Sequence, residues 1–141
     1  MNANNPRQNA QNWFDKARND IAAANNLHCS LNDYENAAFH YQQAVEKLLK
    51  GVLVSYNVTD IEDVMWSHDI EGLADAIIDY TNLSVPDDIY NAADIMNHWE
   101  AETRYPSLYY TNHHILSNEY NRIRRQIGEW LDNIEAFGMF E

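Results

Sequence analysis

Two lysines and their polar neighbours within residues 39–53 have types and a spacing suited to binding a phosphate. Gln43, Lys47 and Lys50 follow one another at i, i+4 and i+7, so they share one face of a helix. Ammonium groups on one face can contact a phosphate together. Glu46 and Lys50 also form an i, i+4 pair, and an exposed pair of this kind stabilises a helix by about 0.2–0.5 kcal/mol. Both interpretations of these residues stay open.

Other signals for a cofactor or a metal are missing from the sequence. The chain has four glycines and no Gly-rich phosphate loop. Its one cysteine, Cys29, excludes a disulfide framework and a multi-cysteine zinc site within one chain. Six histidines are present, and His98 stands four residues before Glu102, but there is no H-E-x-x-H motif. We therefore expect no cofactor and no bound metal.

The elements that must position these residues are helices. Apolar residues of the central stretch recur at helical spacing and predict one buried face, formed by Tyr34, Ala37, Ala38, Tyr41, Ala44, Val45, Leu48, Leu49 and Val52. The same period predicts helices at about residues 7–27, 33–55, 68–80, 84–105 and 117–137. No segment alternates with period two, so no sheet is expected. The predicted fold class is all-α, a five-helix up-and-down antiparallel bundle.

Capping residues set the expected helix boundaries. Asn32 followed by Glu35 is typical of a capping box before the second helix. Ser67, Ser84 and Ser117 are expected to cap the third, fourth and fifth helices. The tyrosine- and histidine-rich stretch before the fifth helix, SLYYTNHHIL, is expected to form a loop.

Several apolar positions and one glycine carry more specific expectations. Residues 56–66 are predicted to be a connecting loop, with Trp66 and its two apolar neighbours as a hydrophobic plug. Ile78 is assigned to the buried face of the third helix. Gly51 lies inside the second helix at a cost of about 1 kcal/mol relative to alanine. We interpret it as a point of close packing, within the chain or across a dimer.

Charge is distributed unevenly along the 141 residues, which carry a net charge of −13. Residues 51–103 contain twelve Asp or Glu and no Lys or Arg. Such a surface repels phosphate backbones, so non-specific nucleic-acid binding and DNA binding are disfavoured. Arg122, Arg124 and Arg125 are the one basic cluster, and we interpret them as a solvated helix face.

The length suits one domain, which we place at residues 7–137. Residues 1–6 are expected to be disordered and residues 138–141 to form a short tail. The polar N-terminus lacks the apolar segment of a signal peptide, and no apolar run reaches the roughly 18 residues that span a membrane. We expect a soluble, cytoplasmic protein that does not bind membranes.

Four segments of the chain resemble the HEPN domain family, named for higher eukaryotes and prokaryotes nucleotide-binding. Residues 39–50 read F-H-x-Q-Q-A-x-E-K-x-L-K, which is similar to the core motif of that family. The other three segments follow in the family's order. They are W-x3-A-x2-D-I from Trp13, H-D-I-x2-L from His68, and R-Y-P from Arg104. The resemblance implies an all-α, HEPN-like bundle.

The resemblance also implies two functions. Some HEPN proteins are metal-independent ribonucleases in which an arginine is followed, after four to six residues, by a histidine. Here eight residues separate Arg104 from His113 and nine separate it from His114, and Pro106 disfavours a continuous helix between them. Arg104 would hold the phosphate and His113 or His114 would act as general acid or base. This ribonuclease is the alternative hypothesis, because the spacing departs from the family pattern.

The leading hypothesis is a HEPN-like interaction module without catalysis. Relatives of this kind are often homodimers that act with a minimal nucleotidyltransferase, in pairs of the toxin–antitoxin type. The resemblance also implies a ligand that is a nucleotide or a short RNA. The candidate nucleotide-binding residues are Gln43, Glu46, Lys47, Lys50 and Arg104.

Overall fold

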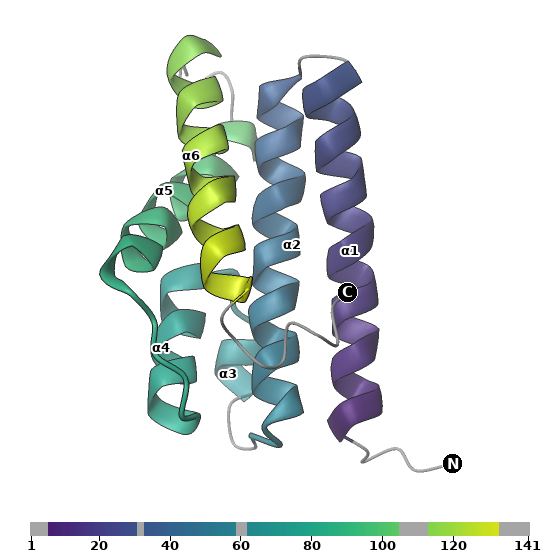
Figure 1. Cartoon of the computed structure of the whole chain (residues 1–141), viewed down its shortest axis with the longest axis vertical. Coiled ribbons are helices and arrows are strands. Elements are labelled where there is room, and N and C mark those ends of the chain that lie inside the picture. Colours follow the sequence, from purple (N-terminus) through teal and green to yellow (C-terminus); the bar gives the residue numbers. More distant parts are fainter. Residues whose placement is uncertain (1–5, 31–32, 59–61, 105–112, 133–141) are drawn as a thin grey trace.

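A computed structural model of the chain describes residues 6–30, 33–58, 62–104 and 113–132. These residues form six helices and no strand (Figure 1). The helices are α1 (Pro6–Ser30), α2 (Tyr34–Ser55), α3 (Glu62–Met65), α4 (Ile70–Tyr80), α5 (Asp87–Arg104) and α6 (His113–Asp132). The predicted all-α class is confirmed. The predicted number of helices was one too low, because α3 is a single turn within the stretch expected to be a loop.

Helix α2 is the centre of the bundle. It packs against α1, α4, α5 and α6, whereas α1 packs mainly against α2 (Figure 1). The predicted apolar face of α2 is buried, from Ala37 to Val52, and forms one core with residues of the other long helices. The periodic pattern thus identified the helix around which the others assemble.

The N-terminal boundaries of four helices differ from those predicted. Helix α5 begins at Asp87, three residues after Ser84, so the prediction that Ser84 caps this helix was wrong. Asp33, not Asn32, caps α2, and its carboxylate accepts a hydrogen bond from the backbone N–H of Asn36 at 3.2 Å. Helix α4 begins at Ile70 after the N-cap Asp69, so Ser67 does not occupy the cap. Ser67 Oγ instead accepts a hydrogen bond from the Asp69 N–H at 2.9 Å.

Helix α6 begins at His113, four residues before the predicted cap Ser117. Residues 113–116, expected in a loop, therefore form the first turn of this helix. The predicted end of the helix near residue 137 lies outside the described residues, as do residues 1–5 and the tail at 138–141. Helix α5 ends at Arg104, one residue from its predicted end.

Gly51 is a point of close contact between α2 and α1 of the same chain. A Cβ atom at this position would lie 2.6 Å from Phe14 Cε1 and 3.1 Å from Trp13 Cβ. Phe14 is buried, with 1% of its surface exposed. The expected close packing is confirmed, and the idea that Gly51 faces a dimer partner is wrong, because α1 already occupies that space.

Two residues assigned to the interior are exposed instead. The relative exposure of Trp66 is 84%, and that of Ile78 is 45%. Val64 and Met65 do pack against the core, so the expected plug contains these two residues without Trp66. In α5 the buried apolar residues are Ile89, Ala92, Ala93, Met96 and Trp99.

Candidate functional site

The family-like residues of α1 and α2 meet in an ionic cluster between these helices. Asp20 of α1 binds the Lys47 ammonium through one carboxylate oxygen, and His40 Nδ1 lies 3.4 Å from the other. All three side chains are partly buried: Asp20 is 16% exposed, Lys47 27% and His40 36%. The i, i+7 spacing of His40 and Lys47 brings both to the side of α2 that faces α1.

A second cluster lies one turn further along α2. Glu46 Oε2 accepts from Lys50 Nζ at 3.2 Å, and Glu46 Oε1 lies 2.9 Å from His68 Nδ1. The side chains of Glu46 and Lys50 are each 5% exposed, whereas that of His68 is 57% exposed. Lys50 Nζ also lies 5.7 Å from the centre of the Trp13 ring, within the range of a cation–π interaction. The expectation of an exposed i, i+4 pair is wrong, because α1 and the segment before α4 cover it.

Burial changes what the Glu46–Lys50 pair contributes to stability. A solvent-exposed ion pair of this spacing stabilises the folded state by about 0.3 kcal/mol. Loss of one partner from a buried pair leaves an uncompensated charge and costs about 3–5 kcal/mol. Lys50 also connects α2 to Trp13 of α1, and Glu46 connects α2 to His68 in the segment before α4.

The residues after His68 are held by α5. Asn97 Nδ2 donates to Asp69 Oδ1 at 2.9 Å, and Asn97 Oδ1 accepts from the Ile70 N–H at 3.1 Å. One amide thus satisfies both the N-cap residue and the first N–H of α4, which has no partner within the helix. The sequence reasoning missed Asn97, because nothing in its local pattern indicates a contact with residues 69 and 70.

These contacts bear on the predicted nucleotide-binding residues of α2. Lys47 and Lys50, the two lysines on this helix, are each paired with a carboxylate. Gln43 Nε2 donates to Gln42 Oε1 at 2.8 Å, and Glu46 is nearly buried. Pairing and burial favour a structural role for these side chains, and their contact with a nucleotide stays a prediction.

The candidate ribonuclease residues lie at consecutive helix ends. Arg104 is the last residue of α5, and His113 and His114 are the first two residues of α6. Helices α5 and α6 pack against each other, so these ends lie at the same end of the bundle (Figure 1). The three side chains lie outside the described residues.

An aromatic cluster around Tyr120 joins α6 to three other helices. The centre of the Tyr120 ring lies 5.2 Å from that of His28, 5.8 Å from Tyr41 and 6.2 Å from Trp99. Arg124 lies over the same ring at 5.4 Å. Burial raises the pKa of Tyr120 to about 12 despite the nearby Arg124. The pKa of His28 is lowered, mainly by burial and to a smaller extent by the positive charge of Arg124. Local spacing in the sequence does not reveal this cluster, because its members come from four different helices.

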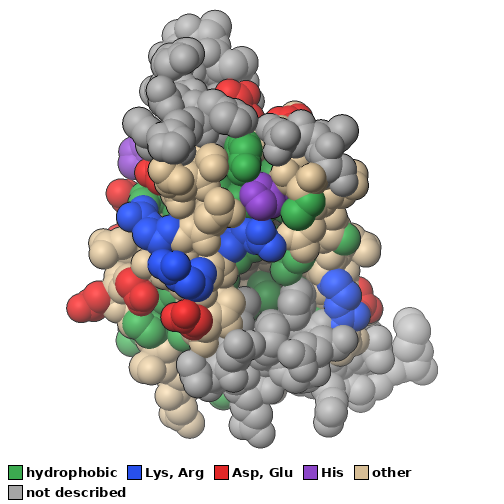
Figure 2. Space-filling model, turned by 45° about the horizontal axis from the view of Figure 1, so that its top comes forward, with side chains coloured by type: hydrophobic (Ala, Val, Ile, Leu, Met, Phe, Trp, Pro, Cys, Tyr) green, Lys and Arg blue, Asp and Glu red, His purple; other side chains and the backbone are tan. Residues whose placement is uncertain are grey.

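Arg124 accounts for part of the predicted basic cluster. Its Nη2 donates to Asn25 Oδ1 of α1 at 2.8 Å, so this arginine is a contact between helices rather than a solvated residue. Arg122 and Arg125 are exposed, as expected. In Figure 2, Lys and Arg side chains lie on one face of the molecule together with several Asp and Glu side chains.

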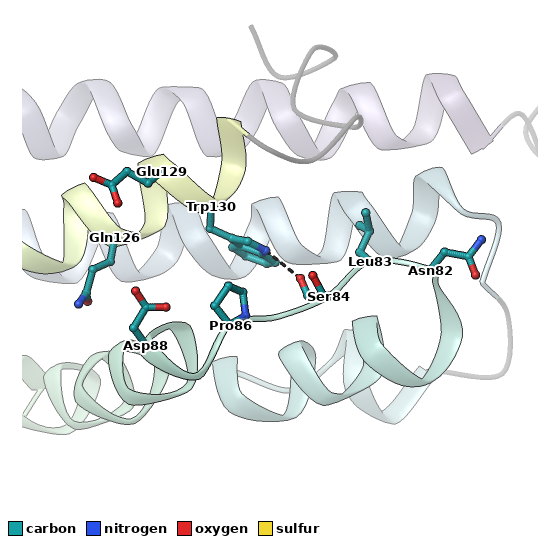
Figure 3. Close-up of a pocket in the computed structure, with 8 residues that line it drawn as sticks. All are labelled: Asn82, Leu83, Ser84, Pro86, Asp88, Gln126, Glu129 and Trp130. Atoms are coloured by element: carbon teal, nitrogen blue, oxygen red, sulfur yellow. Dashed lines mark hydrogen bonds between the residues drawn. The ribbon is translucent and has the colours of Figure 1, made fainter.

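A pocket of about 470 Å³ lies where the segment between α4 and α5 meets α6 (Figure 3). Trp130 forms one wall, and its Nε1 donates to Ser84 O at 3.0 Å. Pro86 lies beside this ring, and Asp88 and Gln126 point toward one another across the opening. The charged lining residues are carboxylates, Asp88 and Glu129, so the pocket is unsuited to a phosphate.

Within the part of the chain that the structure describes, no group of three or more His, Cys, Asp or Glu is arranged to hold a metal ion. None of the described helices is both long enough and apolar enough to cross a membrane.

Comparison with known proteins bears on the four family-like segments. The family model of the HEPN domain matches residues 10–137, nearly the whole chain. No curated protein and no solved structure gives a significant match. The match covers the ionic clusters of α1 and α2, the Asp69–Asn97 contact and the ends of α5 and α6. This chain belongs to the HEPN domain family.

Proposed function

We propose that this chain is a non-catalytic HEPN interaction module that forms a homodimer and acts with a nucleotidyltransferase-like partner, as in toxin–antitoxin pairs. The observation that carries the proposal is the internal pairing of the family-like residues. Asp20 holds Lys47, and Glu46 holds Lys50, so the charged residues of the motif connect helices. Charged side chains that pair inside the chain are not available to a substrate, which supports a module that acts through other parts of its surface.

Nucleotide binding by the face of α2 has less support than protein binding. A phosphate at Lys47 or Lys50 would have to compete with a carboxylate already bound to the ammonium. Breaking a buried ion pair costs about 3–5 kcal/mol. The acidic stretch at residues 51–103 further disfavours polyanionic ligands.

Homodimerisation is tested by light scattering at micromolar concentration, together with sedimentation velocity. We expect a mass twice the 16.4 kDa of one chain. A mass of 16.4 kDa across the concentration range would contradict the dimer.

The partner is tested by co-purification of this chain with a minimal nucleotidyltransferase encoded in the same operon. Failure of the two proteins to co-purify would count against the partner in the proposal.

A metal-independent ribonuclease is the second candidate. It is favoured by the placement of Arg104 and of His113 with His114 at neighbouring ends of two packed helices. The test is cleavage of several RNAs in the presence of EDTA by wild type, Arg104→Ala and the His113→Ala/His114→Ala double variant. The controls are Arg125→Ala and His98→Ala, which alter exposed residues elsewhere. Cleavage by wild type that is lost in Arg104→Ala and in the double variant, but kept in both controls, would establish the enzyme. No cleavage by wild type would leave the non-catalytic module as the proposed function.

A further inference from the structure

The side of the molecule formed by α3, α4 and the first turns of α5 carries negative charge without compensation. Residues 51–103 contain no Lys or Arg. Every described carboxylate in this stretch is exposed: Glu62, Asp63, Asp69, Glu71, Asp75, Asp79, Asp87, Asp88 and Asp94. The described residues with a positive charge lie on α1, α2 and α6 and at the end of α5. The fold therefore converts an uneven sequence into a molecule with one strongly acidic side.

The same stretch carries the exposed large apolar side chains. Among the described residues these are Trp66 at 84% exposure, Tyr80 at 53%, Ile78 at 45% and Tyr56 at 37%. They lie at the ends of α2, α3 and α4, and α4 packs against both α2 and α3 (Figure 1). An indole that is 84% exposed contributes almost nothing to the core of this chain. Exposed aromatic residues amid charges are typical of protein interfaces.

We call the surface of α3 and α4 with Trp66, Ile78 and Tyr80 the acidic–aromatic surface. Its charge restricts what can cover it. Nucleic acid is repelled by the carboxylates. A second copy of the same surface is repelled for the same reason, since a two-fold dimer interface places identical patches face to face. An apolar partner without charge would leave the carboxylates at the rim unpaired.

We propose that the acidic–aromatic surface docks a partner protein that presents lysines or arginines around an apolar stripe. Trp66 and Ile78 bind the stripe, and the carboxylates of α3 and α4, among them Asp63 and Asp79, pair with the basic residues. This inference rests on the proposed function in one respect, that the chain acts through a protein partner. The homodimer, by the charge argument, uses a different face.

The test uses a fluorescein-labelled synthetic helix of about 18 residues with a Leu stripe flanked by Lys and Arg, the arrangement of a helix that binds a groove or surface. Its affinity for the full chain is measured by anisotropy at low and high salt. Shifts in the 15N–1H spectrum of the protein locate the contact. We expect measurable binding, shifts confined to α3, α4 and the residues around Trp66, and weaker binding as salt increases.

Three variants separate the surface from general charge attraction. Trp66→Ala is expected to weaken peptide binding about tenfold, because exposed aromatic anchors contribute disproportionately to interfaces. Asp79→Lys reverses a charge in the last turn of α4, where a lysine suits the helix dipole, and is expected to weaken binding without unfolding the chain. Asp15→Lys makes the same charge change at an exposed position of α1, and its affinity is expected to stay within about twofold of wild type.

A second peptide, with serine in place of the apolar stripe, has the same charge and is expected to lose most of the affinity. Equal binding of both peptides, no binding of either, or shifts mapped to α1 or α6 would each overturn the proposal. The mass of every variant is measured alongside. A Trp66→Ala chain that changes from dimer to monomer would also overturn it, by making the surface the contact between copies. A wild-type monomer that still binds the peptide at this surface would refute the dimer and leave the docking surface standing.

Discussion

Glu46 and Lys50 form an ion pair at 3.2 Å with both side chains 5% exposed, in the centre of a helix whose sequence suggests a solvated face there. The third partner of this pair, His68, comes from the segment before α4. Three of the four family-like segments therefore meet around two residues of α2, because Trp13 lies against Lys50 as well. The charged residues of the family motif in α2 therefore contact residues from other parts of the bundle.

Replacement of one member of the buried pair is expected to destabilise the chain strongly. Lys50→Ala leaves the Glu46 carboxylate buried without a cation, and we expect the free energy of unfolding to fall by about 3–5 kcal/mol. Urea unfolding followed by circular dichroism measures this. Lys16→Ala removes an exposed lysine of α1 and should change stability by no more than about 0.5 kcal/mol. The double variant Glu46→Leu/Lys50→Met should recover most of the loss, and a loss below 1 kcal/mol in Lys50→Ala would show that the pair is not buried in solution.

Two glycines within helices should respond oppositely to alanine. At Gly51 the added Cβ lies 2.6 Å from Phe14 Cε1, so the buried Phe14 ring or α1 itself must shift, and we expect destabilisation by about 1–3 kcal/mol. At Gly128 the added Cβ meets nothing within 4 Å, and the gain in helix propensity should stabilise by about 0.5–1 kcal/mol. Thermal unfolding of the two variants measures the difference. A stabilised Gly51→Ala chain would contradict the close contact of α1 and α2.

Alkaline pH should weaken the fold through Tyr120. Burial raises the pKa of Tyr120 from its ordinary value of 10.0 to about 12. A raised pKa in the folded state means that the neutral phenol stabilises the fold fully below pH 10, and that this contribution is lost as the pH rises toward 12. The loss approaches about 1.4 kcal/mol for each pH unit within this window.

The variant Tyr120→Phe isolates this effect. It removes a buried hydroxyl that has no hydrogen-bond partner among the described residues, so its cost at neutral pH should be small. Between pH 10 and pH 12 the variant should lose less stability than wild type, as measured by urea unfolding at fixed pH values. Tyr41, whose pKa is also raised by burial, remains in the variant and should keep part of the pH dependence. Identical pH profiles of the two chains would refute the role of Tyr120.

The two tryptophans Trp66 and Trp99 should differ in their effect on stability. Trp99 is 2% exposed and lies against Tyr120, so Trp99→Ala should cost about 3–5 kcal/mol. Trp66 is 84% exposed, and Trp66→Ala should change stability by less than about 0.5 kcal/mol. Unfolding curves of both variants measure this. A large loss in Trp66→Ala would place Trp66 in the core and remove the basis of the docking surface.

The sequence alone determined the all-α class, the central place of the second helix and most of the buried positions, because helical periodicity of apolar residues is a local signal. The uneven charge of residues 51–103 was equally visible. Family membership was visible too, in four short segments that the family model confirms across residues 10–137.

Only the tertiary structure decided what surrounds the polar residues of that motif. Whether Lys50 faces solvent or lies beside Trp13 depends on how α1 crosses α2, and Gly51 permits that crossing. The exposure of Trp66 and Ile78 likewise depends on which neighbours reach them, since the helical pattern marks both as apolar without saying how wide the buried face is. Contacts between residues distant in sequence, such as Glu46 with His68, leave no trace in local spacing, because they arise only once the helices pack.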